Sequence, residues 1–215
     1  MNILVVDDHG IVRQGCAELL SQHFRQAEIV EVDSGEAACQ ACRKQHFDLV
    51  VVDYCLPGIS GIETCRRLLQ HDESLRILFF SMFREAGVVR QAISVGALGY
   101  VCKSSSSSLL VDAARSVMLG RPFVEHELSI NLVFRGTNLN ASLYDVMTPR
   151  EFEVLVMIAA GKRVQDVAAS LSLSSKTISN YVTAIKSKLG VRTDAELVHK
   201  AIELGVIRIA AALPA

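Results

Sequence analysis

The 215-residue sequence has no tryptophan, few other aromatic residues and no long hydrophobic run. No apolar stretch approaches the ~20 residues that a membrane-spanning helix needs, which argues against a protein of that class. The first apolar run starts at Ile3, which leaves no room for the basic and apolar regions of a signal peptide. We therefore expect a cytoplasmic protein without a membrane partner.

A large charge of one sign is also missing, because the net charge is only −1. The charge is unevenly spread, however. Residues 1–146 hold 13 Lys and Arg against 17 Asp and Glu, whereas residues 147–215 hold 9 against 6. A basic C-terminal part after an acidic N-terminal part suggests contact with nucleic acid. The length suits two small domains.

The six cysteines all lie in the first half of the chain. Cys39 and Cys42 have the spacing of a redox or metal motif, but they fall in a helix-like segment and lack a second pair of ligands. We interpret them as reduced core or surface residues rather than as a zinc or redox site.

Three short apolar runs in the first half of the chain are each followed by charged residues of the kinds found in catalytic and metal-binding sites. These runs are Ile3–Val6 before Asp7 and Asp8, Leu49–Val52 before Asp53, and Tyr100–Cys102 before Lys103. Segments in which apolar residues recur with the period of a helix alternate with such runs. This alternation predicts a doubly wound, five-stranded parallel sheet with right-handed crossovers.

The carboxyl ends of parallel strands share one crevice, so three carboxylates and one ammonium group are expected to converge there. Such a group of charges suits a divalent cation beside a nucleophilic carboxylate, and therefore phosphoryl transfer. The alternative is that each aspartate is an ordinary solvated turn residue. The complete set makes that alternative the weaker one.

These residues also carry a resemblance to a known family. Asp7-Asp8, Asp53 followed by Leu56-Pro57-Gly58, Ser81 after a fourth apolar run, and Gly99–Lys103 resemble a two-component receiver domain over residues 1–120. The stretch Asp7–Gly15 is similar to the NarL/FixJ/LuxR branch of response regulators. The resemblance implies a flavodoxin-like fold.

The resemblance also implies a role for each residue of the site. Asp53 would accept a phosphoryl group from a partner sensor histidine kinase, and Lys103 and Ser81 would contact that group. Mg²⁺ would be held by Asp7, Asp8, Asp53 and the backbone carbonyl of Cys55. Ser81 and Tyr100 would form the switch, the alternative for Tyr100 being a buried ring with its hydroxyl in water.

Two neighbouring residues need their own interpretation. His9 follows the acidic pair, but we expect it on a helix surface rather than on the cation, because Mg²⁺ favours oxygen ligands. Phe83, two residues after Ser81, is apolar where related receivers often carry a polar residue. We expect it to shield the acyl phosphate from water.

After a predicted linker over residues 121–146, the second domain is expected to span residues 147–215. Thr148-Pro149-Arg150-Glu151 has the pattern of a capping box with proline at the first helical position. Further helix patterns cover Val164–Leu171 and Ser174–Leu189, and a second capping box opens at Thr193. Together they predict a small all-α module of four helices.

This module resembles the LuxR-type DNA-binding domain from Met147 to Thr193, with a helix-turn-helix whose second helix is Ser174–Leu189. The resemblance places Ser179, Asn180 and Thr183 toward base edges. Lysines there suit phosphate contacts, unless they only form a solvated helix face. The implied DNA-binding set is Lys176, Thr177, Ser179, Asn180, Thr183, Lys186 and Lys188.

Together the two resemblances imply a response regulator transcription factor rather than an enzyme, one that catalyses only its own phosphorylation and dephosphorylation. Phosphorylation of Asp53 would favour a homodimer that binds double-stranded DNA. One alternative is a constitutive DNA-binding regulator whose receiver is independent of phosphorylation. Another, an aspartyl-phosphate phosphatase, is disfavoured because Cys55 stands where such enzymes need a second carboxylate.

Overall fold

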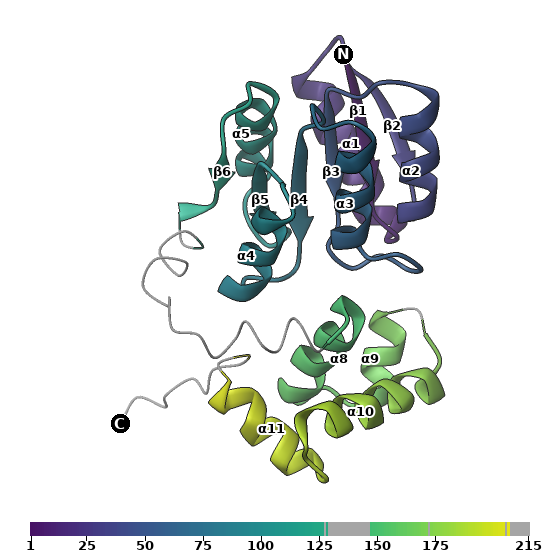
Figure 1. Cartoon of the computed structure of the whole chain (residues 1–215), viewed down its shortest axis with the longest axis vertical. Helices are drawn as coiled ribbons and strands as arrows, with labels where there is room; N and C mark the ends of the chain where they lie inside the picture. The colour runs from purple at the N-terminus through teal and green to yellow at the C-terminus, as the bar shows by residue number, and fades with distance from the viewer. Residues whose placement is uncertain (127, 129–146, 172, 205, 207–215) are drawn as a thin grey trace. The chain divides into compact units, whose positions relative to one another are not determined.

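The computed structural model describes residues 1–126, 128, 147–171, 173–204 and 206. The chain divides into two compact units, Met1–Gly136 and Thr137–Ala215 (Figure 1). No helix within the described ranges is long and apolar enough to cross a membrane. The expected domain limits stay predictions, and most of the predicted linker, residues 129–146, lies outside the described ranges.

The first unit contains a parallel sheet in the order β2-β1-β3-β4-β5-β6. Its strands are β1 Asn2–Val6, β2 Glu28–Val32, β3 Leu49–Val52, β4 Ile77–Ser81, β5 Gly99–Cys102 and β6 Phe123–Val124. The first five strands confirm the prediction. Strands β3 and β5 are buried along their whole length, as their uninterrupted apolar runs require.

The sixth strand was not predicted, because its residues fall in the segment assigned to the linker. Phe123 pairs with Gly99 and Val124 with Tyr100, so β6 extends the sheet beside β5. A two-residue strand after Pro122 leaves too short a pattern to recognise in the sequence. The ordered first unit therefore continues past residue 120.

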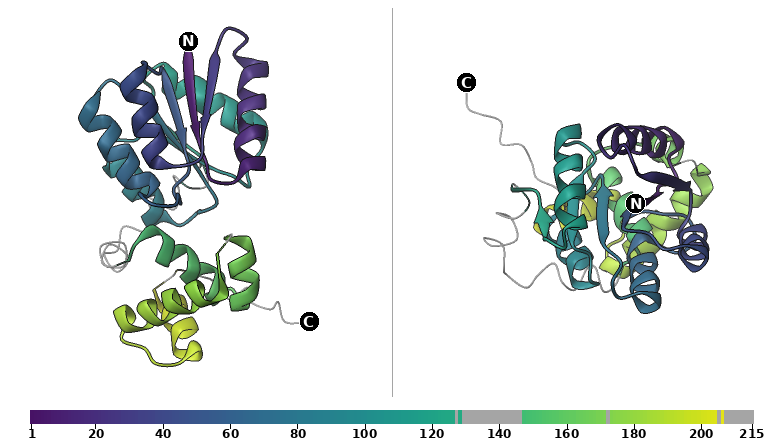
Figure 2. Two further views of the ribbon diagram at one scale, coloured as in Figure 1. Left: turned by 90° about the vertical axis from the view of Figure 1, so that its right-hand side faces the viewer. Right: turned by 90° about the horizontal axis from the view of Figure 1, so that it is seen from above.

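Helices follow each of the first five strands and cover both faces of the sheet. They are α1 Gly10–His23, α2 Gly35–Lys44, α3 Gly61–His71, α4 Ala86–Ser94 and α5 Ser107–Met118. Figure 2 shows α1 and α5 together on one face and the other three helices on the opposite face. This is the predicted doubly wound architecture.

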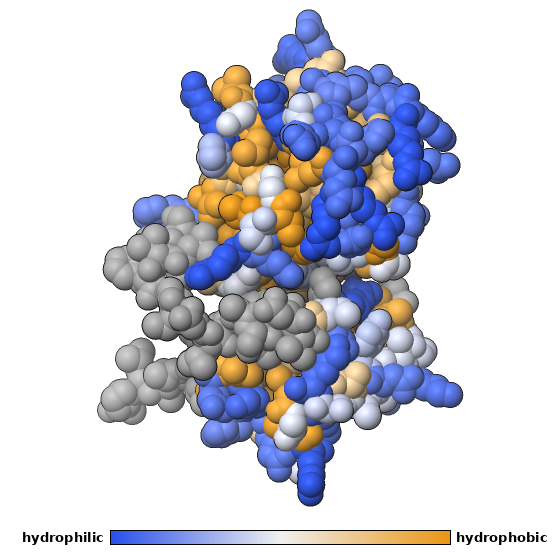
Figure 3. All heavy atoms as spheres, in the orientation of Figure 1, coloured by the Kyte–Doolittle hydropathy of each residue, from blue (hydrophilic) through white to orange (hydrophobic). Residues whose placement is uncertain are grey.

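The core on the α1 and α5 side joins the two helices to the sheet. Leu20 of α1 and Val117 of α5 are fully buried in one cluster with residues of β1, β3, β4 and β5. On the other side of the first unit, Figure 3 shows hydrophobic surface near α4, whereas the region of α2 and α3 is mostly hydrophilic.

A close backbone approach holds the start of α3 against the end of β3. The Gly61 amide donates a hydrogen bond of 3.0 Å to the Tyr54 carbonyl. A Cβ atom on Gly61 would lie 2.0 Å from the Asp53 carbonyl oxygen, closer than any real contact. Glycine is therefore required here, and the backbone around Asp53 is set by this packing.

The second unit is helical. Its helices are α8 Pro149–Ala159, α9 Val164–Ser170, α10 Ser175–Leu189 and α11 Asp194–Glu203. Both predicted capping boxes form, Thr148 with Glu151 and Thr193 with Glu196. Gly190 ends α10 in the left-handed conformation, at a φ of 68°.

The predicted helix-turn-helix core is largely confirmed. Five of its seven residues are buried, namely Val167, Ala168, Leu171, Ile178 and Ile185, and the other two, Val182 and Leu189, are half-buried. Ser172, in the predicted turn, lies outside the described ranges. Helices α8 and α11 also pack against α10, so only part of its surface is left to solvent.

We expect Gly61→Ala to lower the free energy of unfolding by about 1–3 kcal/mol, because the added methyl group overpacks against the Asp53 carbonyl. Gly15→Ala is the matched control, since Gly15 lies inside α1 with nothing within 4 Å of the added Cβ. That change should stabilise the protein by up to about 1 kcal/mol. Denaturant unfolding of both variants measures the difference, and equal stabilities would contradict it.

Candidate functional site

The ends of four neighbouring strands bring the predicted site residues together. Val6 at the end of β1 pairs with Val52 at the end of β3, so the aspartates that follow them emerge side by side. Ser81 pairs with Cys102, which places Ser81 next to the strand that precedes Lys103. The parallel register therefore accounts for the convergence predicted from the sequence.

Lys103 lies between two carboxylates. Its Nζ atom is 2.7 Å from Asp7 Oδ2 and 2.7 Å from Asp53 Oδ2, and the three side chains are only 4–6 % exposed. Burial by itself lowers the pKa of Lys103, but Asp53 and Asp7 outweigh that effect and raise the pKa above its ordinary value. The lysine is thus a permanent cation that compensates the buried aspartates.

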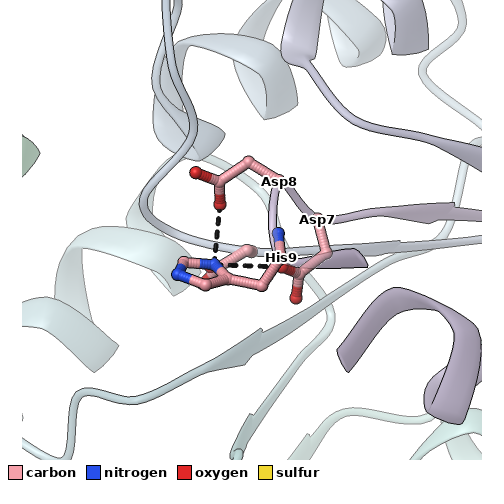
Figure 4. A group of neighbouring side chains, drawn as sticks. Asp7, Asp8 and His9 are labelled. Atoms are coloured by element: carbon pink, nitrogen blue, oxygen red, sulfur yellow. Dashed lines mark hydrogen bonds and ion pairs between the residues drawn. The ribbon is translucent and has the colours of Figure 1, made fainter. Parts of the chain in front are cut away.

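Asp8 and His9 complete the acidic group. Ligand atoms of Asp7, Asp8, His9 and Asp53 lie within 4.8 Å of one another. Figure 4 shows the His9 ring turned back toward the two carboxylates, with Nδ1 at 2.9 Å from Asp8 Oδ1 and 3.5 Å from Asp7 Oδ1. His9 is at the predicted helix start, but its side chain is only 38 % exposed and faces the acidic group.

The arrangement is compatible with a divalent cation. The buried atoms Asp8 Oδ1 and His9 Nδ1 are close together, yet neither makes a well-aligned hydrogen bond within the described part of the chain. Unsatisfied buried oxygen next to two further carboxylates is a donor set that suits a hard cation. Cys55, whose carbonyl was expected to complete the set, is buried two residues after Asp53.

The two predicted switch residues lie in contact. Ser81 ends β4 and is 1 % exposed, and the Tyr100 ring is fully buried. The Tyr100 hydroxyl donates a 2.9 Å hydrogen bond to the Phe83 carbonyl. Burial raises the pKa of Tyr100 well above its ordinary value, and the bond with Ser81 opposes only part of that rise. The alternative of a hydroxyl in water is therefore wrong.

Phe83 lies over the same region. Its ring is 5 % exposed and packs edge-on against Tyr54, the residue after Asp53, with centroids 5.6 Å apart. The Tyr54 hydroxyl in turn bonds to Gln91 of α4. An aromatic pair thus joins the β4–α4 loop to the residue after Asp53.

In the second unit, α10 carries the predicted DNA-contacting residues. Lys176, Ser179, Asn180 and Thr183 are exposed. Thr177 is half-buried, and its amide donates to the Ser174 hydroxyl that caps the helix. Lys176, Ser179 and Asn180 lie in the N-terminal half of α10, and Thr183 lies just past its middle. The N-terminal part of a recognition helix is the part that meets base edges.

The three predicted phosphate-contacting lysines have different surroundings. Lys176 makes no ion pair with any described residue, whereas Lys186 Nζ lies 2.7 Å from Asp194 Oδ1. Lys188 Nζ lies 2.6 Å from Glu151 Oε2 of α8. Burial alone raises the pKa of Glu151, but Lys188 and Thr148 outweigh it and hold the pKa below its ordinary value. Lys188 therefore has a structural contact that its position on α10 did not predict.

Sequence reasoning also missed two arginines. Arg150 Nη2 donates a 3.0 Å hydrogen bond to the Leu171 carbonyl, at the end of α9. Arg84, in the loop after β4, lies 3.3 Å from Glu125. Both contacts join residues more than 20 positions apart, and neither follows a local pattern that the sequence displays.

Two family models match the chain. Residues 3–115 match the response regulator receiver domain, and residues 145–201 match the bacterial regulatory proteins of the luxR family. The transcriptional activator protein ExaE of Pseudomonas putida is 42 % identical over 214 residues, which cover 98 % of this chain and 100 % of ExaE.

Solved structures of similar proteins cover both units. The RcsB response regulator of Salmonella typhimurium is 27 % identical, with a TM-score of 0.58 over 96 % of this chain and 98 % of RcsB. A structure of two RcsB dimers bound to two parallel DNAs is 26 % identical, with a TM-score of 0.59 over 94 % and 98 % of the respective chains.

We expect Lys103→Met to lower the free energy of unfolding by about 3–5 kcal/mol, because it leaves two buried carboxylates without their shared cation. Lys44→Met, at the exposed end of α2, is the control and should change stability little. Denaturant unfolding in the absence of divalent cations measures both. Equal stability of Lys103→Met and wild type would mean that the ion pairs contribute nothing.

Proposed function

The chain belongs to the response regulators that join a receiver domain to a LuxR-type DNA-binding domain, and on that premise we propose that Asp53 is its phosphoacceptor. One observation carries the proposal: the Lys103 ammonium lies 2.7 Å from both Asp53 and Asp7, at the ends of adjacent strands. An ammonium group placed there can exchange its ion pair with Asp53 for one with an incoming phosphoryl group.

The reaction is the transfer of a phosphoryl group from a histidine of a partner sensor kinase. A carboxylate oxygen of Asp53 forms a bond to phosphorus while the bond between phosphorus and the donor nitrogen breaks, and the nitrogen keeps the electron pair. Asp7, Asp8, Asp53 and the Cys55 carbonyl would hold Mg²⁺, which supplies charge stabilisation for the phosphoryl oxygens. Lys103 pairs with one of those oxygens, and the Ser81 hydroxyl donates to another.

Phe83 controls how long the acyl phosphate lasts. Its buried ring against Tyr54 excludes water from the side of the β4–α4 loop. Water is the co-reactant for loss of the phosphoryl group, so shielding slows dephosphorylation.

The output of the switch is DNA binding by a dimer. Ser81 and Tyr100 bias two arrangements of the β4–α4 loop, and phosphorylation shifts the balance between them. We place α10 in the major groove, with Asn180 and Thr183 toward bases and Lys176 toward phosphate. The structure of RcsB dimers bound to DNA supports DNA binding by a dimer. The cytoplasmic location stays a prediction.

The first test is the intact mass after incubation with Mg²⁺ and a small acyl phosphate. Wild type should gain the mass of one phosphoryl group, and Asp53→Asn should gain none, because the amide is not a nucleophile. An adduct that survives in Asp53→Asn would refute Asp53 as the acceptor. No adduct in wild type would favour the constitutive DNA-binding alternative.

The second test separates base contacts from phosphate contacts in the full chain, with a site selected from a random DNA pool. Asn180→Ala should lose about 1–3 kcal/mol of discrimination between the selected site and variants at one position. Lys176→Ala should weaken all sequences alike and reduce the salt dependence by about 0.9 in slope. Lys44→Ala, on α2, is the control. Uniform weakening by Asn180→Ala would contradict its base contact.

A further inference from the structure

Glu125 is a sheltered carboxylate just beyond the matched receiver region, which ends at residue 115. Its side chain is 11 % exposed. The Ser105 hydroxyl donates to Glu125 Oε2 at 2.7 Å, the Cys102 amide lies 3.5 Å from the same oxygen, and Arg84 Nη2 lies 3.3 Å from Oε1. One carboxylate therefore joins two separate loops of the first unit.

Both loops belong to the phosphorylation site. Arg84 follows Phe83, whose carbonyl accepts the Tyr100 hydroxyl, and it is three residues after Ser81. Ser105 is two residues after Lys103. Arg84 also donates directly across the gap between the loops, from Nη1 to the Ser104 hydroxyl at 3.3 Å. Glu125 thus contacts the neighbours of Ser81, Tyr100 and Lys103 without contacting the reacting atoms.

The backbone fixes where this carboxylate lies. Val124 pairs with Tyr100 in the sheet, so β6 carries the next residue to the same end of the strands as the site. After Glu125, Leu128 is 1 % exposed, and its amide donates a 2.9 Å hydrogen bond to the Glu125 carbonyl. Glu125 is therefore anchored on both sides.

We propose that Glu125 is a positioning residue of the phosphorylation site, which holds the loops after β4 and β5 in a fixed relation through Arg84 and Ser105. The inference rests on the proposed phosphorylation of Asp53. Ser81 and Lys103 must reach oxygens of one phosphoryl group, and they are carried by these two loops. A link between the loops restricts them to the arrangement in which Ser81 and Lys103 contact the phosphoryl group at the same time.

The position of Glu125 gives the link a second consequence. Glu125 precedes the segment that leads from the first unit to the second. A movement of the β4–α4 loop must either carry Glu125 with it or break its contact with Arg84. The Glu125 carboxylate thus couples the conformation of the β4–α4 loop to the chain that continues from β6.

The test compares Glu125→Gln with Glu73→Gln in the full-length protein. Glu73 is exposed in the turn before β4, at the opposite end of the strands, and is the matched control. Without donor or divalent cation, hydrogen exchange at residues 82–85 and 104–106 should accelerate in Glu125→Gln only. With Mg²⁺ and a small acyl phosphate, adduct formation in that variant should slow on the order of 10-fold while the unfolding transition stays cooperative.

A double-mutant cycle shows whether Glu125 acts through Arg84. Arg84→Gln should slow phosphorylation similarly, and the double variant should be no slower than either single variant. Ser105→Ala removes one donor, leaves the ion pair, and should give a smaller effect. Unchanged exchange and rate in Glu125→Gln would overturn the proposal, and so would additive single effects. If wild type forms no adduct, the proposed phosphorylation fails and this inference falls with it.

Discussion

The first unit depends on the compensation of buried negative charge by Lys103. Strands β1 and β3 bring three aspartates to one sheet edge, and the carboxylates of Asp7 and Asp53 are almost excluded from water. Without a cation between them, their repulsion would oppose the parallel register that brings them together. In the proposed reaction the same lysine exchanges its ion pair with Asp53 for one with the incoming phosphoryl group.

Much of this site was predictable from the sequence. The apolar runs before Asp7, Asp53 and Lys103 predicted strands, and parallel strands have their carboxyl ends at one edge whatever the details of packing. The capping boxes at Thr148 and Thr193 were equally easy to predict, because a capping box joins residues only three positions apart in the sequence. Family membership, fold class and a transcription factor role are confirmed, while the role of each site residue stays a prediction.

What the sequence concealed are contacts between distant segments. The pairing of Lys188 with Glu151 spans 37 positions, and that of Arg84 with Glu125 spans 41. The choice of partner for a charged side chain depends on packing, not on local periodicity. For the same reason the sequence predicted an amphipathic edge position for Tyr100 as one alternative, whereas the structure buries its hydroxyl against the Phe83 carbonyl.

Glu151 serves two helices at once. Its carboxylate accepts the Thr148 amide at 2.7 Å, which caps α8, and it pairs with Lys188 near the end of α10. A substitution of Lys188 therefore strands a carboxylate that is 6 % exposed, and one of Glu151 uncaps a helix as well. Single substitutions at Glu151 or Lys188 are therefore costly, and the two positions are expected to change together in related sequences.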